Sequence, residues 1–334
     1  MTMKHIAIIG AGAIGGVLGA LLQRAGYEVT LIGRPAQVQA IRRNGLRVEG
    51  CLGTFTVHPA AAEALESRPE LVFLTVKAQD VVAALQANAA FLTGVPLVTC
   101  QNGIRGDELA ATLLPRDQLI SAVVMTGANY LTPGTVTVAS PGALVIGRSY
   151  GPLDDQVGDV AAVLHAVIST RTTANILGAH WLKLIVNLNN ALPALTDTTL
   201  QRVFADPYLS RVSVRMMREG LHVNGRAGIR LEPIPGVPAV LIRLVANLPM
   251  RLATLILNTS ARRLYTDVPV LGSTLQSVRR GRPTEIDYLN GEVVRTGRQL
   301  DVPVPLNTAV VELVHQTEQT GKFFTVDELR ARLT

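Results

Sequence analysis

The sequence predicts an α/β protein in which an N-terminal, doubly wound parallel sheet is followed by an all-helical domain. Three observations support this prediction. A glycine-rich turn follows a short apolar run at residues 5–9. Short apolar strands then alternate with helices and glycine turns as far as about residue 174. From Ile176 onward the apolar residues recur with a helical period. We therefore expect two domains, at 1–174 and 175–334, as the length of 334 residues also suggests.

The N-terminal glycines have the spacing of a dinucleotide-binding turn. After the apolar run, Gly10-Ala11-Gly12-Ala13-Ile14-Gly15 opens a helix. In a G-x-G-x-x-G turn the first glycine permits the tight turn, the second lets the backbone approach a pyrophosphate, and the third lets helix and strand pack closely. A second strand at Glu28–Ile32 follows at the right distance. We predict a Rossmann-type domain; the alternative is a glycine-rich turn in another α/β protein.

The residue after the second strand indicates which dinucleotide is bound. An NAD site usually has Asp or Glu there for the ribose hydroxyls. Here the run is Ile32-Gly33-Arg34-Pro35, with no acid and with Arg34 as the nearest cation. An arginine at this point suits a 2′-phosphate, so we predict NADP(H). The alternative is an ordinary surface arginine in an arginine-rich chain.

Composition narrows the choice of partners. The net charge of +6 and the pI of about 9.7 admit nucleic acid. The arginines are scattered, however, and aromatic residues make up only 4% of the chain, so no basic stripe with stacking residues is present. Anionic small molecules explain the basic excess as well. We therefore expect a small-molecule substrate and no nucleic-acid partner.

Cysteine usage and the N-terminus favour a cytoplasmic protein. Cys51 and Cys100 are the only cysteines and fit a reducing compartment. They have no metal-ligand spacing with the six histidines, so we expect no metal. A strand starts almost at once and no cleavage site follows it, which argues against a signal peptide.

The longest apolar stretch, residues 239–257, is long enough to suggest a membrane span. It contains Arg243, Asn247, Pro249 and Arg251, which a spanning helix would tolerate poorly. We expect no membrane association. Two amphipathic helices are predicted instead, packed in the helical domain or at a subunit interface.

Lysine is rare, and two lysines lie in apolar runs. Only four of the 31 basic residues are lysine, and Lys77 and Lys183 stand among apolar neighbours. A desolvated lysine can give up its proton, whereas arginine cannot. Lys183 and Asn187 are four residues apart, so they share one helix face. The alternatives are chance survival of two lysines and a polar stripe that faces solvent.

Polar residues also end several other predicted elements. Lys77 and Asn102 follow two apolar strands, where Lys77 could neutralise a phosphate or carboxylate and Asn102 could bind ribose or a carbonyl. For Asn102-Gly103 the alternative is a turn dipeptide. Pro283 suits a helix start, so Glu285 could be a helix-start carboxylate or could hold Lys183 or a ribose hydroxyl. The runs 135–138 and 143–147 are predicted to form an antiparallel hairpin or a sheet edge.

Over essentially the whole chain the sequence resembles the ketopantoate reductase (2-dehydropantoate 2-reductase) family. The more specific parts of the resemblance are a lysine–asparagine pair and a T-E-I-D-Y-x-N-G stretch. The matching segments are Gly10–Gly15, Arg34, Val76-Lys77-Ala78, Gln101-Asn102-Gly103, Lys183 with Asn187, and Ser273 with Thr284-Glu285-Ile286-Asp287-Tyr288-Leu289-Asn290-Gly291.

The resemblance implies NADPH-dependent reduction of ketopantoate to pantoate, on the route to pantothenate and coenzyme A. It implies a cofactor domain at 1–174 and, at 175–334, a helical substrate-binding domain like the C-terminal domain of 6-phosphogluconate dehydrogenase. It also admits a homodimer. Lys183 would be the catalytic proton donor. The cofactor residues would be Gly10–Gly15, Arg34, Lys77, Asn102 and Glu285; the substrate residues would be Asn102, Lys183, Asn187 and Ser273.

The chain departs from the family pattern where substrate would be held. Ala191, followed by Leu192, stands where the family usually has a second asparagine, and Asn190 is one residue short of that position. Ser277 stands where an acid is frequent, and the stretch from about 232 to 267 is longer than in compact members. A reductase of another 2-keto or 3-keto acid therefore stays open. A non-catalytic NADPH-binding sensor is a further alternative, against which the set of Lys183, Asn187 and Glu285 argues.

Overall fold

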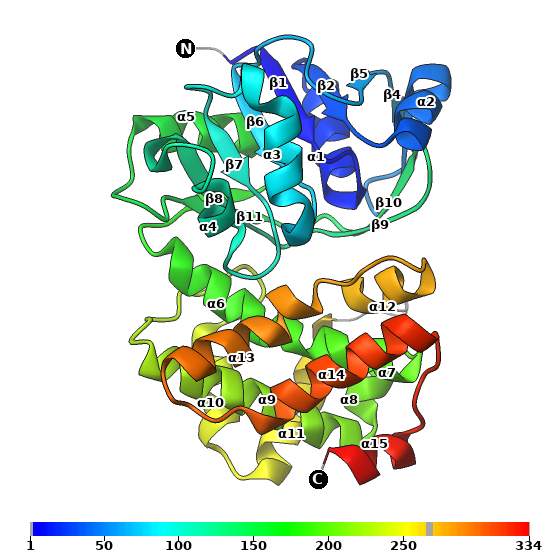
Figure 1. The fold of residues 1–334 in the computed structure, drawn as a ribbon, viewed down its shortest axis with the longest axis vertical. Helices are drawn as coiled ribbons and strands as arrows, with labels where there is room; N and C mark the ends of the chain where they lie inside the picture. The colour runs from blue at the N-terminus through cyan, green and yellow to red at the C-terminus, as the bar shows by residue number, and fades with distance from the viewer. Residues whose placement is uncertain (1–2, 265–269, 334) are drawn as a thin grey trace. The chain divides into compact units, whose positions relative to one another are not determined.

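The computed structural model describes residues 3–264 and 270–333. The chain divides into two compact units, Met1–Ile176 and Leu177–Thr334 (Figure 1). The first unit contains the β-sheets with their covering helices, and the second unit is helical. This confirms the predicted fold class. The binding roles given to residues 1–174 and 175–334 stay predictions.

The main sheet of the first unit has the order β12-β11-β8-β7-β6-β1-β2-β5. The strands from β8 to β5 run parallel, and β11 and β12 run in the opposite direction. The sheet order reverses at β1, which continues to β2 on one side and has β6 on the other. Its strands are β1 His5–Ile9, β2 Glu28–Ile32, β5 Ala60–Ala62, β6 Leu71–Leu74, β7 Leu97–Thr99, β8 Leu119–Val124, β11 Leu144–Gly147 and β12 Thr170–Thr172.

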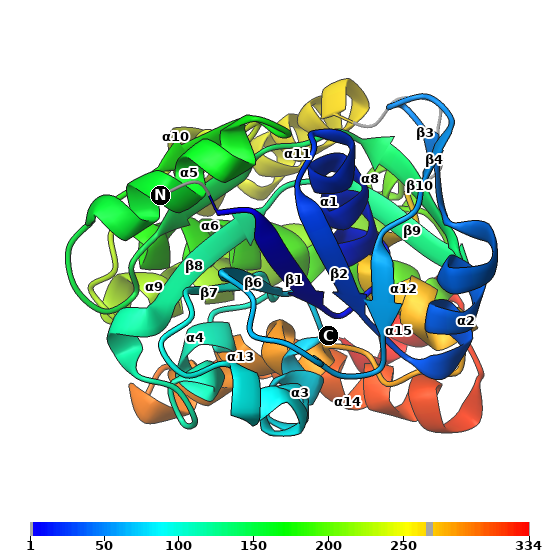
Figure 2. The same cartoon turned by 90° about the horizontal axis from the view of Figure 1, so that it is seen from above.

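The central strands are apolar on both sides because helices cover both faces of the sheet. One core lies between the sheet and α1 with α5, and another between the sheet and α3 with α4 (Figure 2). The helices and 3₁₀ turns of this unit are α1 Ala13–Arg24, α2 Pro35–Asn44, η1 Ala78–Asp80, α3 Val81–Asn88, η2 Ala89–Phe91, α4 Gly106–Ala110, η3 Arg116–Gln118 and α5 Asp155–His165.

A second, four-stranded sheet packs on the outer side of α1. Its order is β4-β3-β10-β9. A Cβ atom on Gly16 would lie 2.7 Å from Val136 Cγ1, so only a glycine lets α1 approach this sheet so closely. The helix is therefore enclosed between two sheets. The strands are β3 Leu46–Gly50, β4 Phe55–Val57, β9 Gly127–Thr132 and β10 Thr135–Ser140.

The predicted hairpin of residues 135–138 with 143–147 is wrong. β10 pairs with β9 and β3 in the small sheet, whereas β11 pairs with β8 and β12 in the main sheet. The connection turns at Gly142, which has φ +64°, and the Thr126 hydroxyl donates a hydrogen bond to the Pro141 carbonyl. The burial patterns also differ, because β10 buries Val136 and Val138 on one face while every residue of β11 is buried.

The second unit is helical, as the sequence predicted. Among its described residues the only β-pairing is an isolated bridge between Ile234 and Val237. Local signals explain individual helix starts: the Asp206 carboxylate accepts hydrogen bonds from the N–H groups of Tyr208 and Leu209 as α9 begins. The elements are α6 Ile176–Asn187, η4 Leu188–Asn190, α7 Ala191–Thr196, α8 Leu200–Ala205, α9 Pro207–Arg226, α10 Ala239–Asn247, α11 Met250–Leu264, α12 Gly272–Arg279, η5 Ile286–Tyr288, α13 Asn290–Gln299, α14 Pro305–Thr320 and α15 Val326–Arg332.

Residues 239–257 form two amphipathic helices, as predicted, with the break between α10 and α11 at Leu248-Pro249. Within the described chain, no helix is long and apolar enough to cross a membrane. The pair exposes Val240, Leu244, Leu252 and Leu255, and a subunit interface there stays a prediction. Residues 265–267 of the longer stretch lie outside the described residues.

We expect Gly15→Ala to destabilise the first unit and Gly12→Ala to leave it nearly unchanged. A Cβ atom on Gly15 would lie 2.5 Å from Thr75 Oγ1 and would overlap the Gly10 carbonyl oxygen, whereas nothing lies within 4 Å of a Cβ on Gly12. Gly15→Ala should cost about 1–3 kcal/mol of unfolding free energy, and Gly12→Ala roughly 0.5 kcal/mol or less. Thermal unfolding without nucleotide measures both variants. Equal melting temperatures would contradict the close contact at Gly15.

Candidate active site

The glycine-rich turn after β1 is held between two neighbouring strands. The N–H groups of Gly10 and Ala11 both donate to the Ile32 carbonyl at the end of β2, at 2.9 Å. From the β6 side, the Thr75 hydroxyl donates to the Gly10 carbonyl at 2.8 Å. Gly10 has φ +115°, and a Cβ atom there would lie 2.5 Å from the Val76 backbone nitrogen. Its position therefore requires glycine, both for conformation and for space.

The turn leads into a helix start that suits an anionic group. The N-cap of α1 is Gly12, which has no side chain to cap the helix, and the first turn contains no acidic residue. The positive end of the helix dipole is therefore not offset by a nearby carboxylate. Because the space beside Gly12 is open, a phosphate can approach the backbone there.

The structure brings the predicted residues of the first unit to one edge of the main sheet. β1 pairs in parallel with β2 and β6, and β6 pairs in parallel with β7, so the carboxyl ends of these strands face the same way. Arg34, Lys77 and Asn102 follow β2, β6 and β7, and the glycine turn follows β1. This is the switch point of the sheet order, where ligands of doubly wound folds bind. Lys77 stands three residues beyond the end of β6, as the N-cap of η1.

Arg34 is a surface residue at the start of α2. Its side chain is 68% exposed and lies 3.6 Å from the Asp80 carboxylate of η1. An exposed ion pair of this length contributes little to stability. A phosphate group, which can accept two parallel hydrogen bonds from a guanidinium, can therefore compete with Asp80 for Arg34.

Two buried glutamines, to which the sequence analysis gave no role, position the loops of this edge. Gln37 donates to the Ala11 carbonyl at 2.9 Å and accepts from the Gly134 N–H at 2.7 Å. Gln101 donates to the carbonyls of Leu74 and Val76, at 2.7 and 3.0 Å, and so fastens the loop that carries Asn102 to the segment that carries Lys77. A polar residue on the apolar face of α2, four positions before buried Ile41, was the available signal for Gln37.

In the second unit, Lys183 and Asn187 lie on one partly exposed face of α6. Three of their neighbours, Leu182, Leu184 and Ile185, are fully buried. The helix therefore packs its apolar side into the unit and leaves an ammonium and a carboxamide together on the other side.

Helix α12 lies against the turn that follows α6. A Cβ atom on Gly272 would lie 3.1 Å from Asn190 Oδ1, and Gly272 has φ +74°. Ser273 is the next residue and is partly exposed. Ser277, at the position where an acid is frequent in the family, is 2% exposed and donates to the Ser273 carbonyl at 3.1 Å. This position therefore carries no charge and faces inward.

The predicted helix start at Pro283 is wrong. Residues 286–288 form the 3₁₀ turn η5, and α13 begins only at Asn290, because the Thr284 hydroxyl accepts the Ile286 N–H and closes a short turn. Glu285 precedes this turn and is 8% exposed. Asn290 donates to the Leu188 carbonyl at 3.3 Å, which links the segment to the turn after Asn187.

His315 of α14 fastens the same segment between two carboxylates. Its Nδ1 lies 2.9 Å from Glu318 Oε2 and its Nε2 lies 3.0 Å from Asp287 Oδ1. Burial of the imidazole lowers its pKa, but the hydrogen bonds to Glu318 and Asp287 outweigh burial, so the pKa of His315 is raised above its usual value. Burial raises the pKa of Glu318, and its hydrogen bonds with Thr284 and His315 lower that pKa below the usual range overall.

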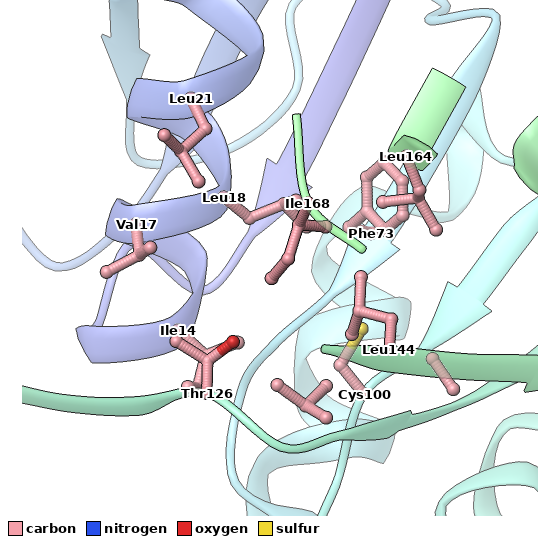
Figure 3. Close-up of a pocket in the computed structure, with 12 residues that line it drawn as sticks. Ile14, Val17, Leu18, Leu21, Phe73, Cys100, Thr126, Leu144, Leu164 and Ile168 are labelled. Atoms are coloured by element: carbon pink, nitrogen blue, oxygen red, sulfur yellow. The ribbon is translucent and has the colours of Figure 1, made fainter. Parts of the chain in front are cut away.

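An apolar pocket in the first unit lies under α1. Its lining differs from the candidate site residues described above, which are polar or charged. Ile14, Val17, Leu18 and Leu21 of α1 line one side, opposite core residues of the sheet and α5 (Figure 3). Thr126 provides the one hydroxyl in its lining, and no charged group is present there. The pocket belongs to the hydrophobic core and lacks groups that could bind a phosphate or a carboxylate. Within the described part of the chain, no group of three or more His, Cys, Asp or Glu residues could hold a metal ion.

A glycine turn at the switch point of a doubly wound sheet is typical of the dinucleotide-binding domain of oxidoreductases. Comparison with known families agrees. Residues 6–151 match the family model described as Ketopantoate reductase PanE/ApbA, and residues 175–318 match its C-terminal counterpart. The chain belongs to the ketopantoate reductase family, as the resemblance predicted, and is an oxidoreductase that acts on a keto group. A non-catalytic sensor has no support from this membership.

Several relatives match along nearly their whole length. The 2-dehydropantoate 2-reductase of Pyrococcus horikoshii is 29% identical over 95% of this chain and 98% of its own. That of Mesorhizobium japonicum is 30% identical over 93% and 97%. The crystal structure of a PanE/ApbA family ketopantoate reductase from Ralstonia eutropha has a TM-score of 0.78 and 32% identity, covering 94% of this chain and 98% of that one. D-mandelate dehydrogenase with NADH and anilino(oxo)acetate has a TM-score of 0.83 at 23% identity, over 94% and 98%, and shows the same fold.

We expect the stability of the second unit to fall as pH rises above about 6.5, the pKa of an unperturbed histidine. Because the pKa of His315 is raised on folding, its contribution is fully present below the unfolded pKa of about 6.5 and is lost as pH rises through the folded pKa. His315 is partly exposed, so the effect should be roughly 1 kcal/mol or less, a few degrees in Tm.

Thermal unfolding of His315→Gln across this pH range measures the effect. The melting temperature of this variant should no longer fall with pH. His222→Gln, a change at an exposed histidine of α9, should keep the pH dependence of wild type. An unchanged slope in His315→Gln would assign the pH dependence to another group.

Proposed function

We propose that this chain is an NADPH-dependent 2-dehydropantoate 2-reductase, which reduces ketopantoate to pantoate on the route to pantothenate and coenzyme A. The observation that carries the proposal is the shared, partly exposed face of Lys183 and Asn187 on α6, in a chain whose full-length relatives have this activity in their names. The start of α12 beside η4 supports Ser273 as a third member of the substrate site.

The residues at the sheet edge fit NADPH. The open space beside Gly12 and the uncompensated dipole of α1 suit the pyrophosphate, and Arg34 suits the 2′-phosphate. Lys77 and Asn102 follow the two strands next to β1 on the β6 side, in a position to contact the ribose, the phosphates or, for Asn102, the substrate. Glu285 is proposed as a further cofactor residue from the family resemblance.

When bound, NADPH supplies the hydride that reduces the keto carbon. As the carbon–oxygen π bond breaks, its electron pair moves to the oxygen, and the Lys183 ammonium donates a proton from Nζ to that oxygen to form the hydroxyl. Asn187 and Ser273 hold the carboxylate end of the substrate, because hydride transfer requires near-contact geometry at the keto carbon. The products are a 2-hydroxy acid and NADP⁺.

Another 2-keto acid is the second candidate substrate. Two observations favour it: Ala191 is fully buried, so it offers no side chain to a ligand, and Ser277 is buried and neutral where family members frequently have an acid. The reduction step is the same for either substrate, and the difference lies in how the remainder of the molecule is held. We also propose a cytoplasmic location, in which the thiols of Cys51 and Cys100 stay reduced.

The proposal is tested by NADPH oxidation with ketopantoate and a panel of other 2-keto acids, using wild type and Lys183→Ala. Wild type should reduce ketopantoate well above the panel, and loss of the proton donor should lower kcat about 10²–10⁴-fold while the affinity for NADPH stays within roughly threefold. Lys183→Arg should not restore turnover, because a guanidinium cannot release its proton.

Lys322→Ala is the matched control, since Lys322 is an exposed lysine of the same unit. Retained turnover in Lys183→Ala would remove the proton-donor role. Tight NADPH binding by wild type without ketopantoate turnover would instead reject the substrate and keep the cofactor.

We expect Arg34→Ala to weaken NADPH and to leave NADH nearly unaffected. The variant loses a charge-assisted contact to a phosphate that only NADPH carries, which should raise its Kd about 10–100-fold. Nucleotide fluorescence titration measures both affinities. Arg43→Ala is the control, because Arg43 is an exposed arginine at the other end of α2. It should change the affinity for neither nucleotide. An equal loss for both nucleotides would assign Arg34 to another part of the cofactor.

A further inference from the structure

The segment that carries Glu285 is fastened to α14 on both sides of this residue. Immediately before it, the Thr284 N–H donates to Glu318 Oε1 at 2.6 Å. Two residues after it, Asp287 Oδ1 lies 3.0 Å from His315 Nε2. Both Glu318 and His315 belong to α14, so one helix holds the segment at two points. The position of buried Glu285 therefore depends on the backbone between these points.

A single imidazole connects the two points. His315 Nδ1 lies 2.9 Å from Glu318 Oε2, and Nε2 lies 3.0 Å from Asp287 Oδ1. An ionised carboxylate only accepts hydrogen bonds, so both ring nitrogens must donate for both bonds to form. Only the protonated imidazole has two N–H groups. A neutral ring keeps one bond and turns a lone pair toward the other carboxylate, which repels it.

The bond to Asp287 is the one that a neutral ring gives up. The Glu318 side chain is 20% exposed and also accepts from the Thr284 N–H, whereas the Asp287 side chain is 60% exposed. A well-solvated carboxylate exchanges an ion-pair partner for water at little cost. We therefore expect deprotonation to release the point that follows Glu285 and to keep the point that precedes it.

The charged groups that face the imidazole are Asp287 from η5 and Glu318 from α14 itself, and both act on its pKa. The other elements packed against α14 are α7, α9 and α13. Helix α7 contains no charged residue. In α13, Glu292 pairs with Arg295 at 2.5 Å, and Glu219 of α9 accepts from N–H groups at the start of α14. Both facing groups are carboxylates, so near neutral pH the imidazole is the group of this cluster that titrates.

We propose that His315 is a positioning residue, which holds Glu285 in its ligand-binding place while the imidazole is protonated and releases it when the ring is neutral. This inference rests on the proposed function, in which Glu285 contacts NADPH, and adds a pH dependence of NADPH affinity. Because binding and protonation are linked, NADPH should in turn favour the protonated ring.

The experiment measures the Kd of NADPH by fluorescence titration, from below to well above the unperturbed histidine pKa of about 6.5. In wild type the Kd should rise about 2–5-fold with pH, as expected for the loss of a partly exposed charge-assisted bond. His315→Lys keeps its charge over this range, so it should keep the low Kd throughout. His315→Gln should have the high Kd already at the acidic end.

Turnover separates positioning for binding from an effect on the reaction. With saturating NADPH, kcat should follow the same pH profile in wild type, His315→Lys and His315→Gln, because the change concerns nucleotide affinity and not the proton donor. A merely structural role would lower kcat or the melting temperature of His315→Lys as well, and would not be rescued by a cation.

Two further variants make the comparison interpretable. His222→Lys introduces the same substitution at an exposed histidine of α9 and should keep the wild-type profile. Ionisation of the nucleotide phosphate acts on every variant alike. If His315→Lys folds poorly, Asp287→Asn is the second test: a carboxamide can accept from a protonated ring or donate to a neutral one, so the Kd should stay low at every pH.

The outcomes separate the inference from the proposed function. A rise in Kd that His315→Lys shares with wild type would assign the pH dependence to another group, and a flat wild-type profile would mean that His315 does not act on nucleotide binding. Either result overturns the inference, while ketopantoate turnover by wild type upholds the function.

If wild type binds no NADPH at any pH, the proposed function fails, and hydrogen exchange tests the positioning role by itself. The Tyr288 N–H donates to the Glu285 carbonyl at 2.9 Å. Its exchange should be equal in wild type and His315→Lys at the acidic end of the range and faster in wild type at the alkaline end. Equal exchange at both ends would overturn the inference.

Discussion

The close packing of the first turn of α1 against β1 and β6 is the contact on which the first unit depends. It requires backbone to approach backbone, with Gly15 beside the Gly10 carbonyl and the Thr75 hydroxyl bonded to that carbonyl. A side chain at either glycine would push the helix outward, and α1 cannot move far because the small sheet covers its other side at Gly16. The same contact directs the N-terminus of α1 and its dipole toward the switch point. The close packing therefore both stabilises the first unit and forms the candidate anion site.

Buried carboxamides hold the loops beside the glycine turn of the first unit and the turn after α6 in the second unit. Gln37 bonds to the glycine turn, Gln101 to the segment before Lys77, and Asn290 to the turn after Asn187. A buried amide must find partners, and the backbone carbonyls of irregular segments need them too, so each pair satisfies both groups. Hydrogen bonds act over a short distance and depend on direction. They therefore restrict the positions of the loops that carry proposed functional residues more than apolar packing would.

Local signals predicted most of the elements, and failures came where a tertiary partner decides. The glycine turn, β2 and the break at Pro249 depend on nearby residues, so the sequence was sufficient there. The partner of β10 was not predictable from its alternating pattern, because that pattern indicates a buried face and not which strand lies beside it. At Pro283 the helix signal was overridden when the Thr284 hydroxyl closed a turn and Glu318 accepted the Thr284 N–H. The 3₁₀ turn after α6 was not predicted either, because an α-helical period does not anticipate such a turn.

The two units present different means of recognition. Arg34 is an exposed cation, so its attraction for a phosphate acts at a distance and weakens with salt. In the second unit, the row of Lys183 and Asn187 that we propose as the substrate site, with Ser273, offers neutral dipoles beside an ammonium. Neutral dipoles attract a ligand only weakly from a distance. However, a carboxamide that loses its bound water and gains no hydrogen-bond partner lowers the binding free energy considerably. Selectivity of such a row therefore comes chiefly from rejecting molecules that leave an amide unmatched.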